Sequence, residues 1–454
     1  MIDPRLVAVI RQEPRYEIDV VRASVRRVLK ELGLTWSEII RPGDRVLLKP
    51  NFIRESHTER PGEWEQIITH GSVIAAVAFE VADALGGRGT ITIADAPQTD
   101  SDFGRICSRT GMAALQERLG RDHPGMNVEI LDLRREYWRT ERGVVVERRR
   151  LREDPRGYTL VDLGEHSSFH GKAGAFYGAD YDTAFTASHH SNGRHEYLIS
   201  RSAMDADVFI NLPKLKTHKK VGVTLSLKNL VGINGDKNYL PHFCIGTPAQ
   251  GGDEFPRSDS ASRLQSLLIS GFKQAAKWSG PAAKLWAPVA VRLGARMFGS
   301  THAVVRSGNW HGNDTTWRMT LDLNRILFHF DGTAQARRKP LRYLTIIDGI
   351  VAGEGNGPME ADAKPCGVLV GGTNPVAADW AAAELMGFDW RKIPTIREAF
   401  RLSDLPLVDF SPEQIRIVPD AGRILHFRPH FGWTGHIEAE NGVGVAEPGP
   451  ATFP

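Results

Sequence analysis

The sequence has little cysteine and no long apolar run. Its 454 residues include only Cys107, Cys244 and Cys366, which lie far apart along the chain. We therefore expect no zinc ribbon, no iron–sulfur cluster and no disulfide framework. No window of about 20 apolar residues occurs, and no charged start is followed by an apolar stretch. These absences predict a protein of the reducing cytoplasm, with neither a membrane span nor a signal peptide.

A large excess of one charge is also missing, because the formal net charge is +3. With 41% hydrophobic and 24% charged residues, the composition is that of an ordinary globular protein. Nothing in the overall charge indicates nucleic acid as a partner. Lysine, however, is distributed unevenly: a window of 24 residues holds Lys214, Lys216, Lys219, Lys220, Lys228 and Lys237. Because the rest of the chain mostly uses arginine, this window indicates a local site for an anion. The alternative is a solvated charged face, especially for Lys219 and Lys220.

Strand and helix patterns alternate along much of the chain. The expected strands are residues 5–11, 44–51, 90–95, 127–133, 207–212, 343–348, 367–371 and 414–418. The expected helices are residues 18–34, 72–86, 109–121, 316–331, 375–387 and 392–402. This alternation predicts an α/β fold with a doubly wound, mostly parallel, Rossmann-like sheet.

Two segments interrupt the alternation, one polar and rich in loops, the other largely helical. The predicted units are an α/β core in three parts (1–134, 201–257 and 336–420), a polar β/loop insertion (135–200), a helical segment (258–335) and a Gly/Pro-rich tail (421–454). Within the helical segment, residues 269–299 alternate basic and apolar side chains, but Pro281 and Pro288 divide them into short pieces. We expect a lid or a subunit contact there, in preference to attachment to a membrane.

Polar side chains stand where several expected strands end. Lys49 closes one strand, Asp95 the next, Lys214 follows a third and Asp348 closes a fourth. In open α/β sheets, ligands bind beyond the carboxyl ends of parallel strands. We therefore expect these side chains to face one crevice, where Asp95 and Asp348 would orient groups or hold a divalent cation such as Mg²⁺.

The segment from residue 211 to residue 232 concentrates candidate site residues. Lys214, Lys216 and His218 would share one face of an extended chain, while Thr224 and Lys228 would share one face of a helix. A lysine desolvated among other cations can lose its proton and act as a base, and His218 is the alternative proton carrier or a structural residue. The candidate catalytic residues are Lys216, His218 and Lys228. The candidate substrate-binding residues are Lys49, Asn51, Asn211, Lys214, Thr217, Thr224 and Asn229.

Three further features have two interpretations each. The glycines between 349 and 358 form either an anion-binding nest or a tight turn. The five histidines between His166 and His195 belong either to a metal site or to a polar lid. Between Trp310 and Arg325, tryptophans beside amides and carboxylates suit either a ring-shaped ligand or the start of a helix.

Six motifs together resemble the family known as domain of unknown function 362. They are Lys49-Pro50-Asn51, the run Asp-Val-Phe-Ile-Asn-Leu-Pro-Lys-Leu-Lys-Thr-His ending at His218, Leu-Lys-Asn-Leu-Val-Gly at 227–232, Asp348-Gly349, Gly357-Pro358 and Asn-Pro-Val-Ala-Ala-Asp at 374–379. Many members carry a ferredoxin-like cysteine module, which this sequence lacks. The resemblance implies a shared site and no particular reaction.

The expected function is that of an enzyme that acts on an anionic small metabolite, phosphorylated or carboxylated. A transferase, an isomerase and a lyase fit equally well. Two alternatives from other classes stay open, namely an iron–sulfur-linked redox protein and a non-catalytic ligand-binding or scaffold protein.

Overall fold

The computed structural model describes residues 2–141, 144–172, 174–178, 182–257, 307–419 and 422–440. The predicted lid or subunit contact at residues 269–299 lies outside these residues, as does the end of the predicted tail.

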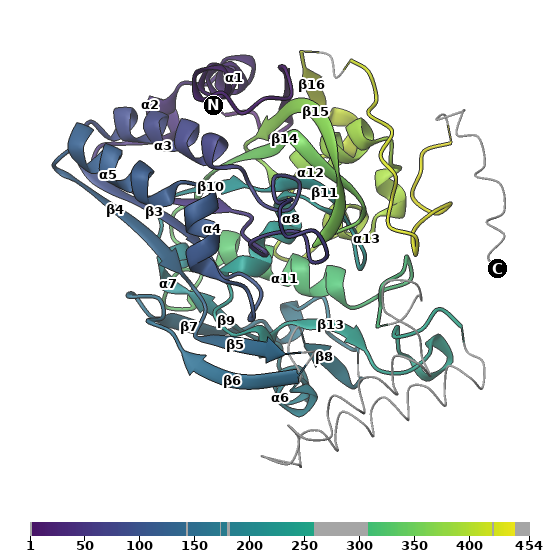
Figure 1. Cartoon of the computed structure of the whole chain (residues 1–454). Helices are drawn as coiled ribbons and strands as arrows, with labels where there is room; N and C mark the ends of the chain where they lie inside the picture. Colours follow the sequence, from purple (N-terminus) through teal and green to yellow (C-terminus); the bar gives the residue numbers. More distant parts are fainter. Residues whose placement is uncertain are drawn as a thin grey trace.

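A mixed sheet forms the centre of the described chain, in the order β16-β1-β15-β14-β10-β2-β3-β4, with β11 beside β14 and β12 beside β11 (Figure 1). Its strands are β1 (Leu6–Arg11), β2 (Arg45–Pro50), β3 (Gly89–Asp95), β4 (Met126–Asp132), β10 (Val208–Leu212), β11 (Lys214–His218), β12 (Gly222–Thr224), β14 (Arg342–Asn356), β15 (Glu360–Gly372) and β16 (Arg416–Val418). The run from β14 through β10, β2 and β3 to β4 is parallel throughout. The predicted α/β class with a mostly parallel, Rossmann-like sheet is confirmed.

Helices cover both faces of this sheet, as its buried strands require. One face packs against α1 (Ile18–Glu31), α3 (Gly71–Leu85) and α5 (Met112–Asp122) through one apolar core. The opposite face packs against α11 (Thr316–His329) and α12 (Pro375–Met386). The shorter helices are α2 (Trp36–Ile39), α4 (Phe103–Arg109), α6 (Thr183–His189), α7 (Arg201–Met204), α8 (Ser226–Asn229) and α13 (Pro394–Ala399).

Most of the glycine-rich segment after Asp348 is strand, and the predicted turn is limited to residues 357–359, which join β14 to β15. The segment continues β14 as far as Asn356, in an antiparallel pair with β15. Its glycines allow β11 to approach closely. A Cβ on Gly349 would lie 2.7 Å from Leu215 Cδ2, and one on Gly353 would lie 3.1 Å from Lys216 Cβ. The glycines therefore serve packing between strands.

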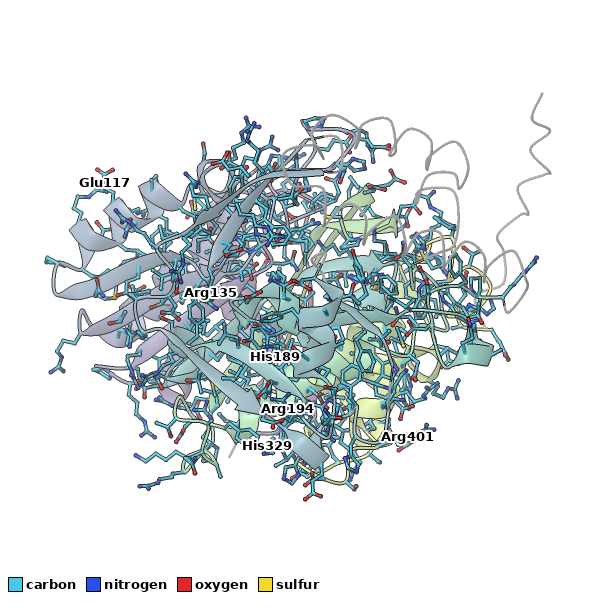
Figure 2. The ribbon with its side chains drawn as sticks, turned by 90° about the horizontal axis from the view of Figure 1, so that it is seen from below. Glu117, Arg135, His189, Arg194, His329 and Arg401 are labelled. Carbon is cyan, nitrogen blue, oxygen red and sulfur yellow. The ribbon has the colours of Figure 1, made fainter. Side chains whose placement is uncertain are left out.

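The polar segment after β4 builds small sheets beside the central one. The pairs are β5 (Glu136–Glu141) with β6 (Val144–Arg150), β7 (Tyr158–Asp162) with β9 (Glu196–Ser200), and β8 (Phe176–Gly178) with β13 (Pro241–Cys244). Figure 2 shows the labelled side chains of His189 and Arg194 in this region. Because β13 follows β11 in the sequence, the small sheets join the polar segment to the chain that carries the lysine window.

Among the residues described, none of the helices has both the length and the apolar character needed to cross a membrane.

Candidate functional site

The short helix α8 is held in place by two buried side chains from longer helices. Asp379 of α12 accepts hydrogen bonds from the backbone N–H groups of Ser226 (2.7 Å) and Leu227 (2.9 Å). Asn324 of α11 donates to the carbonyl oxygen of Leu227 at 3.0 Å. Burial raises the pKa of Asp379 to about 7, against the effect of the N–H donors. The two long helices thus fix the position of the lysine at 228.

A chain of amides connects α8 to the ends of the parallel strands. Asn51 donates to Asn229 Oδ1 (3.0 Å), Asn229 donates to Asn211 Oδ1 (2.7 Å), and Asn211 donates to the hydroxyl of Tyr343 (2.9 Å). All three asparagines are buried. The structure therefore brings together the asparagines predicted to bind substrate, and it uses their amides to hold one another.

Lys49 and Asp95, at the ends of the neighbouring strands β2 and β3, form a buried ion pair. Lys49 Nζ lies 2.7 Å from Asp95 Oδ1, and it also donates to the carbonyl oxygen of Pro50 at 2.9 Å. Asp95 Oδ2 accepts the backbone N–H of Phe52 at 2.6 Å. Burial lowers the pKa of Lys49, and Asp95 opposes this shift.

Lys214 and Asp348 form a second buried pair, at 2.5 Å. Lys214 Nζ also donates to the hydroxyl of Tyr16 (3.1 Å) and to the carbonyl oxygen of Val351 (3.3 Å), so its three protons all have protein acceptors. Asp348 additionally accepts the backbone N–H of His70 at 3.0 Å. Burial lowers the pKa of Lys214, with Asp348 acting in the opposite direction.

These two ion pairs count against the predicted Mg²⁺ site at Asp95 and Asp348. Each carboxylate binds its own ammonium group, and the described residues contain no group of three or more His, Cys, Asp or Glu that could hold a metal ion. The carboxylates stabilise lysines in the interior, where an unpaired charge would be costly.

Lys216 is fully buried and has no carboxylate partner among the described residues. Its Nζ donates to Asn51 Oδ1 (3.2 Å) and to the carbonyl oxygens of Ile67 and Pro358. Burial and the nearby Lys214 lower its pKa well below the ordinary value of lysine. Lys214 and Lys216 each have three acceptors within the protein around Nζ, and their predicted roles, in binding substrate and in proton transfer, stay predictions.

Lys228 differs from these lysines. Its side chain is only 8% exposed, and it has no hydrogen-bond or ion-pair partner within the described parts of the chain. Burial, followed by the charges of Lys237 and Lys49, lowers its pKa to about 7. At neutral pH a large fraction of this side chain is therefore the free amine.

Two imidazoles interact electrostatically with Lys228. His218 Nδ1 accepts the backbone N–H of Lys220 at 3.0 Å, so its neutral ring carries the proton on Nε2. His242 Nδ1 lies 2.8 Å from the carbonyl oxygen of Leu240, to which it donates, so its Nε2 bears the lone pair. Burial and then Lys228 lower the pKa of both histidines well below the ordinary value. One ring thus presents a donor and the other an acceptor.

The two threonines predicted to bind substrate lie in the same region. Thr217 Oγ1 donates to the carbonyl oxygen of Gly355 at 2.9 Å. Thr224 Oγ1 is enclosed without a hydrogen-bond partner, on the strand that pairs with Lys216. A shallow surface hollow lies farther along, between Lys237 and the side chains of β5 such as Trp138.

Sequence analysis missed the roles of His242, Lys237 and Asp379. His242 is a single histidine on a short strand, and no motif distinguishes it. Lys237 belongs to the lysine window, and its Nζ donates at 2.8 Å to the carbonyl oxygen of Ala96, which directly follows the end of β3. Asp379 stands in the motif at 374–379, but its contact with α8 joins residues more than 150 positions apart.

The histidines of the polar segment make different contacts, although the ring centroids of His190 and His195 lie only 5.8 Å apart. His190 Nε2 donates to the carbonyl oxygen of Tyr239 within an aromatic cluster, His189 pairs with Glu196, and His170 is exposed. Burial lowers the pKa of His190 to about 3. This arrangement is that of packing and surface ion pairs, and the interpretation as a metal site has no support within the described residues.

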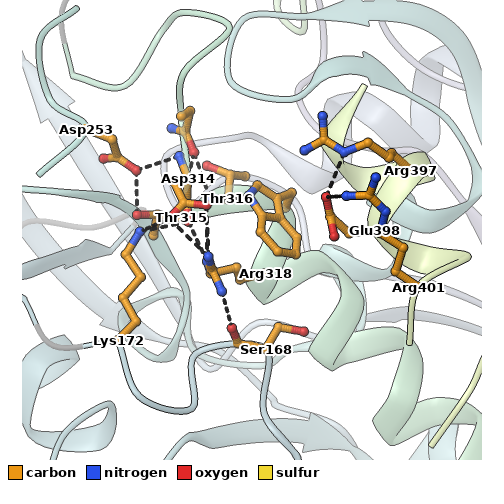
Figure 3. A network of polar contacts seen from close by, with 12 residues as sticks. Ser168, Lys172, Asp253, Asp314, Thr315, Thr316, Arg318, Arg397, Glu398 and Arg401 are labelled. Atoms are coloured by element: carbon orange, nitrogen blue, oxygen red, sulfur yellow. Dashed lines mark hydrogen bonds and ion pairs between the residues drawn. The ribbon is translucent and has the colours of Figure 1, made fainter. Parts of the chain in front are cut away.

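The start of α11 is an internal polar network, shown in Figure 3. Asp314 binds Lys172 and Arg318, while Asp253 accepts from the hydroxyl of Thr315 at 2.6 Å. The indole N–H groups are also occupied: that of Trp310 donates to the carbonyl oxygen of Asp253. The polar groups of this segment stabilise the start of the helix, as the second interpretation expected.

The cysteines lie on three different elements. Cys107 is on α4, Cys244 on β13 and Cys366 on β15, and all three are free thiols. Burial raises the pKa of each thiol, so at neutral pH each one stays protonated and unreactive.

Residues 165–384 match the model of a family described as "Domain of unknown function (DUF362)". This stretch of the chain is similar to that family. The matched stretch includes β10, β11, α8 and the helices that hold α8, whereas Lys49, Asn51 and Asp95 precede it. The predicted resemblance to this family is confirmed.

A thylakoid-associated protein of Synechocystis sp. is 26% identical over 387 residues, which is 85% of this chain and 76% of that protein. A crystal structure of a protein from Thermotoga maritima aligns with 83% of this chain at 10% identity and a TM-score of 0.34. The present chain spans 60% of the length of that protein.

Proposed function

We propose that this protein is an enzyme that binds an anionic small metabolite beside Lys228. The observation that carries the proposal is the side chain of Lys228, which is nine-tenths buried, adjoins other cations and has no partner in the described structure. An unpaired cation in the interior is unfavourable, and an anionic ligand would remove that penalty. Folded proteins rarely retain such a group without a function for it.

The surrounding groups support a reaction that includes proton transfer. His218 offers an N–H donor, His242 offers a lone pair, and the amine of Lys228 lies within the electrostatic influence of both. A donor and an acceptor whose protonation states differ suit general acid–base chemistry. The role of proton carrier predicted for His218 and Lys228 is therefore retained in the proposal, and that of Lys216 is reduced to positioning Asn51. A transferase, an isomerase and a lyase all remain compatible with this set.

Binding of anions by isothermal titration calorimetry tests the proposal. The panel consists of inorganic phosphate, lactate and the metabolites that native mass spectrometry finds on the purified protein. We expect Lys228→Met to reduce affinity at least tenfold, which is about 1.4 kcal/mol. Lys339→Met removes the same charge from an exposed position and is expected to change affinity little. Equal losses in the two variants, or no binding at all, contradict the proposal.

We also propose that the protein resides in the cytoplasm. The support is its three free cysteines, which are typical of a reducing compartment. Because one relative is named as thylakoid-associated, the experiment separates soluble from membrane fractions before and after a high-salt wash. Recovery of the protein with membranes after the wash contradicts a cytoplasmic location.

A further inference from the structure

The chemical state of Lys228 indicates more than attraction for an anion. A lysine that only binds anions works best as a fully charged, well-positioned ammonium group. Lys228 instead lies where water is largely excluded, with Lys49 and Lys237 close enough to disfavour a further positive charge. Such surroundings favour the neutral amine, whose nitrogen has a lone pair.

The other buried lysines of the region differ from Lys228 because their nitrogen atoms have partners within the protein. The nitrogen atoms of Lys49 and Lys214 are bound to the carboxylates of Asp95 and Asp348. That of Lys216 contacts three oxygen acceptors. Each of these nitrogens keeps its protons engaged with protein oxygen, so none of them is available for attack on a substrate. Lys228 is the buried lysine of this cluster that has no such contact in the described structure.

The histidines beside Lys228 match the needs of a carbonyl substrate that also carries a carboxylate. The Nε2–H group of His218 can donate to an oxygen of the substrate, since its other ring nitrogen is already occupied by the N–H of Lys220. The positive charges of Lys237 and Lys49, which act on Lys228, favour the carboxylate. The lone pair on His242 Nε2 can accept a proton that the amine loses.

We propose that Lys228 is a nucleophile that forms an imine with a 2-oxo acid. This inference rests on the proposed function, since it assigns the substrate class and the covalent chemistry of the same site.

The steps balance without an oxidant, a reductant or any co-reactant. The lone pair of the Lys228 amine attacks the carbonyl carbon, and the C–O double bond becomes a single bond. The nitrogen loses a proton and the oxygen gains one, which gives a carbinolamine. The oxygen then takes up a second proton and leaves as water while the C=N bond forms. The resulting protonated imine withdraws electrons from the adjacent carbon, which prepares a bond at that carbon for cleavage or for proton exchange.

Reductive trapping tests the inference on the full chain. The wild-type protein is incubated at pH 7 with pyruvate and sodium cyanoborohydride, and peptide mapping locates the 1-carboxyethyl groups. We expect Lys228 to be labelled at least about tenfold faster than the exposed Lys30 and Lys339, because more of it is neutral. Glyoxylate and 2-oxoglutarate are tested in the same way, and acetone serves as the carbonyl compound without a carboxylate.

The controls separate this inference from the proposed function. Lys228→Arg keeps a cation but lacks a nucleophilic amine, so it is expected to lose the label at that position while its circular dichroism spectrum is unchanged. Labelling of Lys228 no faster than that of Lys339 with all three 2-oxo acids overturns the imine. Equally fast labelling by acetone overturns the assignment of a 2-oxo acid. If lactate binding depends on Lys228 but no covalent adduct forms with any 2-oxo acid, the proposed anion site is supported and only the proposed imine is contradicted.

Discussion

A Cβ atom on Gly232 would lie 1.7 Å from Oδ1 of Asp95 and 2.7 Å from Nζ of Lys49. The chain after α8 therefore runs directly over the buried ion pair between β2 and β3, where only glycine leaves enough room. The backbone contact is also direct, because the carbonyl oxygen of Gly232 accepts the N–H of Ala96 at 2.8 Å.

Gly232→Ala is the first test of this arrangement. We expect it to lower the free energy of unfolding by about 3–5 kcal/mol, because the methyl group separates a buried carboxylate from its ammonium partner. Gly120→Ala is the matched control: a Cβ there meets nothing within 4 Å, and the position lies in α5. That control should raise stability by about 0.5–1 kcal/mol. Urea unfolding of both variants measures the difference, and equal stabilities would contradict the close approach.

The position of these groups could be predicted from the sequence because each one follows a buried apolar run. Lys49 and Asp95 stand at the ends of the parallel neighbours β2 and β3, and the rule for parallel sheets places such ends at one edge. Asp348 lies within β14, just past its parallel pairing with β10, so the prediction that it ends a strand is wrong. The partners of these groups could not be predicted. Whether such a carboxylate holds a cation or a lysine depends on contacts such as that between Asp348 and Lys214, which lie 134 residues apart.

The structure of the glycine-rich segment after Asp348 could not be predicted, because glycine is suited to more than one local structure. Glycines after Asp348 suit a turn as well as a strand that another strand crosses closely, and spacing alone does not distinguish them. The acceptor role of His242 depends on its hydrogen bond with Leu240, only two residues earlier. No sequence pattern indicates which ring nitrogen that bond would occupy.

Tyr16 connects the second ion pair to the backbone. Its hydroxyl donates to Asp348 Oδ1 at 3.0 Å and accepts from Lys214 Nζ and from the N–H of Val351, both at 3.1 Å. Tyr16→Phe removes one hydrogen-bond partner from each of these three groups, and we expect a loss of about 1–3 kcal/mol in the free energy of unfolding. Tyr137→Phe removes a hydroxyl that has no hydrogen bond among the described residues, and it should be nearly neutral. Thermal and urea unfolding measure the stability of the two variants. A small loss of unfolding free energy in both of them would contradict a stabilising role for the Tyr16 hydroxyl.

Asp379→Ala is predicted to have an effect that depends on pH. The wild-type carboxyl group has its pKa raised to about 7 in the folded protein, above the ordinary value of 3.8. The contribution of Asp379 to the free energy of unfolding is therefore fully present below about pH 4, and it is lost as the pH rises through about 7. We expect the variant to be less stable than wild type at pH 5, because two N–H groups of α8 lose their acceptor. At pH 8 the difference in unfolding free energy should be smaller by a few kcal/mol, on the order of 1.4 kcal/mol per unit of pKa shift.

Asp389→Ala controls for the loss of a capping carboxylate elsewhere, since Asp389 accepts the N–H of Arg391 at 3.0 Å. It should lower stability without affecting the trapping of Lys228. A difference between Asp379→Ala and wild type that grows from pH 5 to pH 8 would contradict the raised pKa of Asp379.

Lys228→Met should stabilise the protein at neutral pH. The pKa of Lys228 is about 7 when folded and has its ordinary value of 10.5 when unfolded, so the unfolded state binds more protons between these values. The free energy of unfolding of the wild-type protein therefore rises as the pH increases from 7 to 10.5. Below pH 7 the buried group is the charged ammonium, and its full destabilising effect is present. We expect the variant to exceed wild type by up to about 4 kcal/mol at pH 7 and by much less near pH 10. Urea unfolding at the two pH values measures this, and Lys339→Met should show no such trend.

The protonation of the two imidazoles is the most direct test of the site. Because His218 Nδ1 accepts an N–H and His242 Nδ1 donates to a carbonyl oxygen, the rings should be opposite tautomers. Burial and the charge of Lys228 lower both pKa values well below that of ordinary histidine, so both rings should be neutral at pH 7. Long-range ¹H–¹⁵N correlation spectra distinguish the Nε2–H form of His218 from the Nδ1–H form of His242. In Lys228→Met, where one nearby positive charge is gone, both pKa values should rise. An imidazolium signal for His218 at pH 7 in the wild-type protein would remove it as a neutral donor, and identical tautomers would remove the donor–acceptor pair on which proton transfer depends.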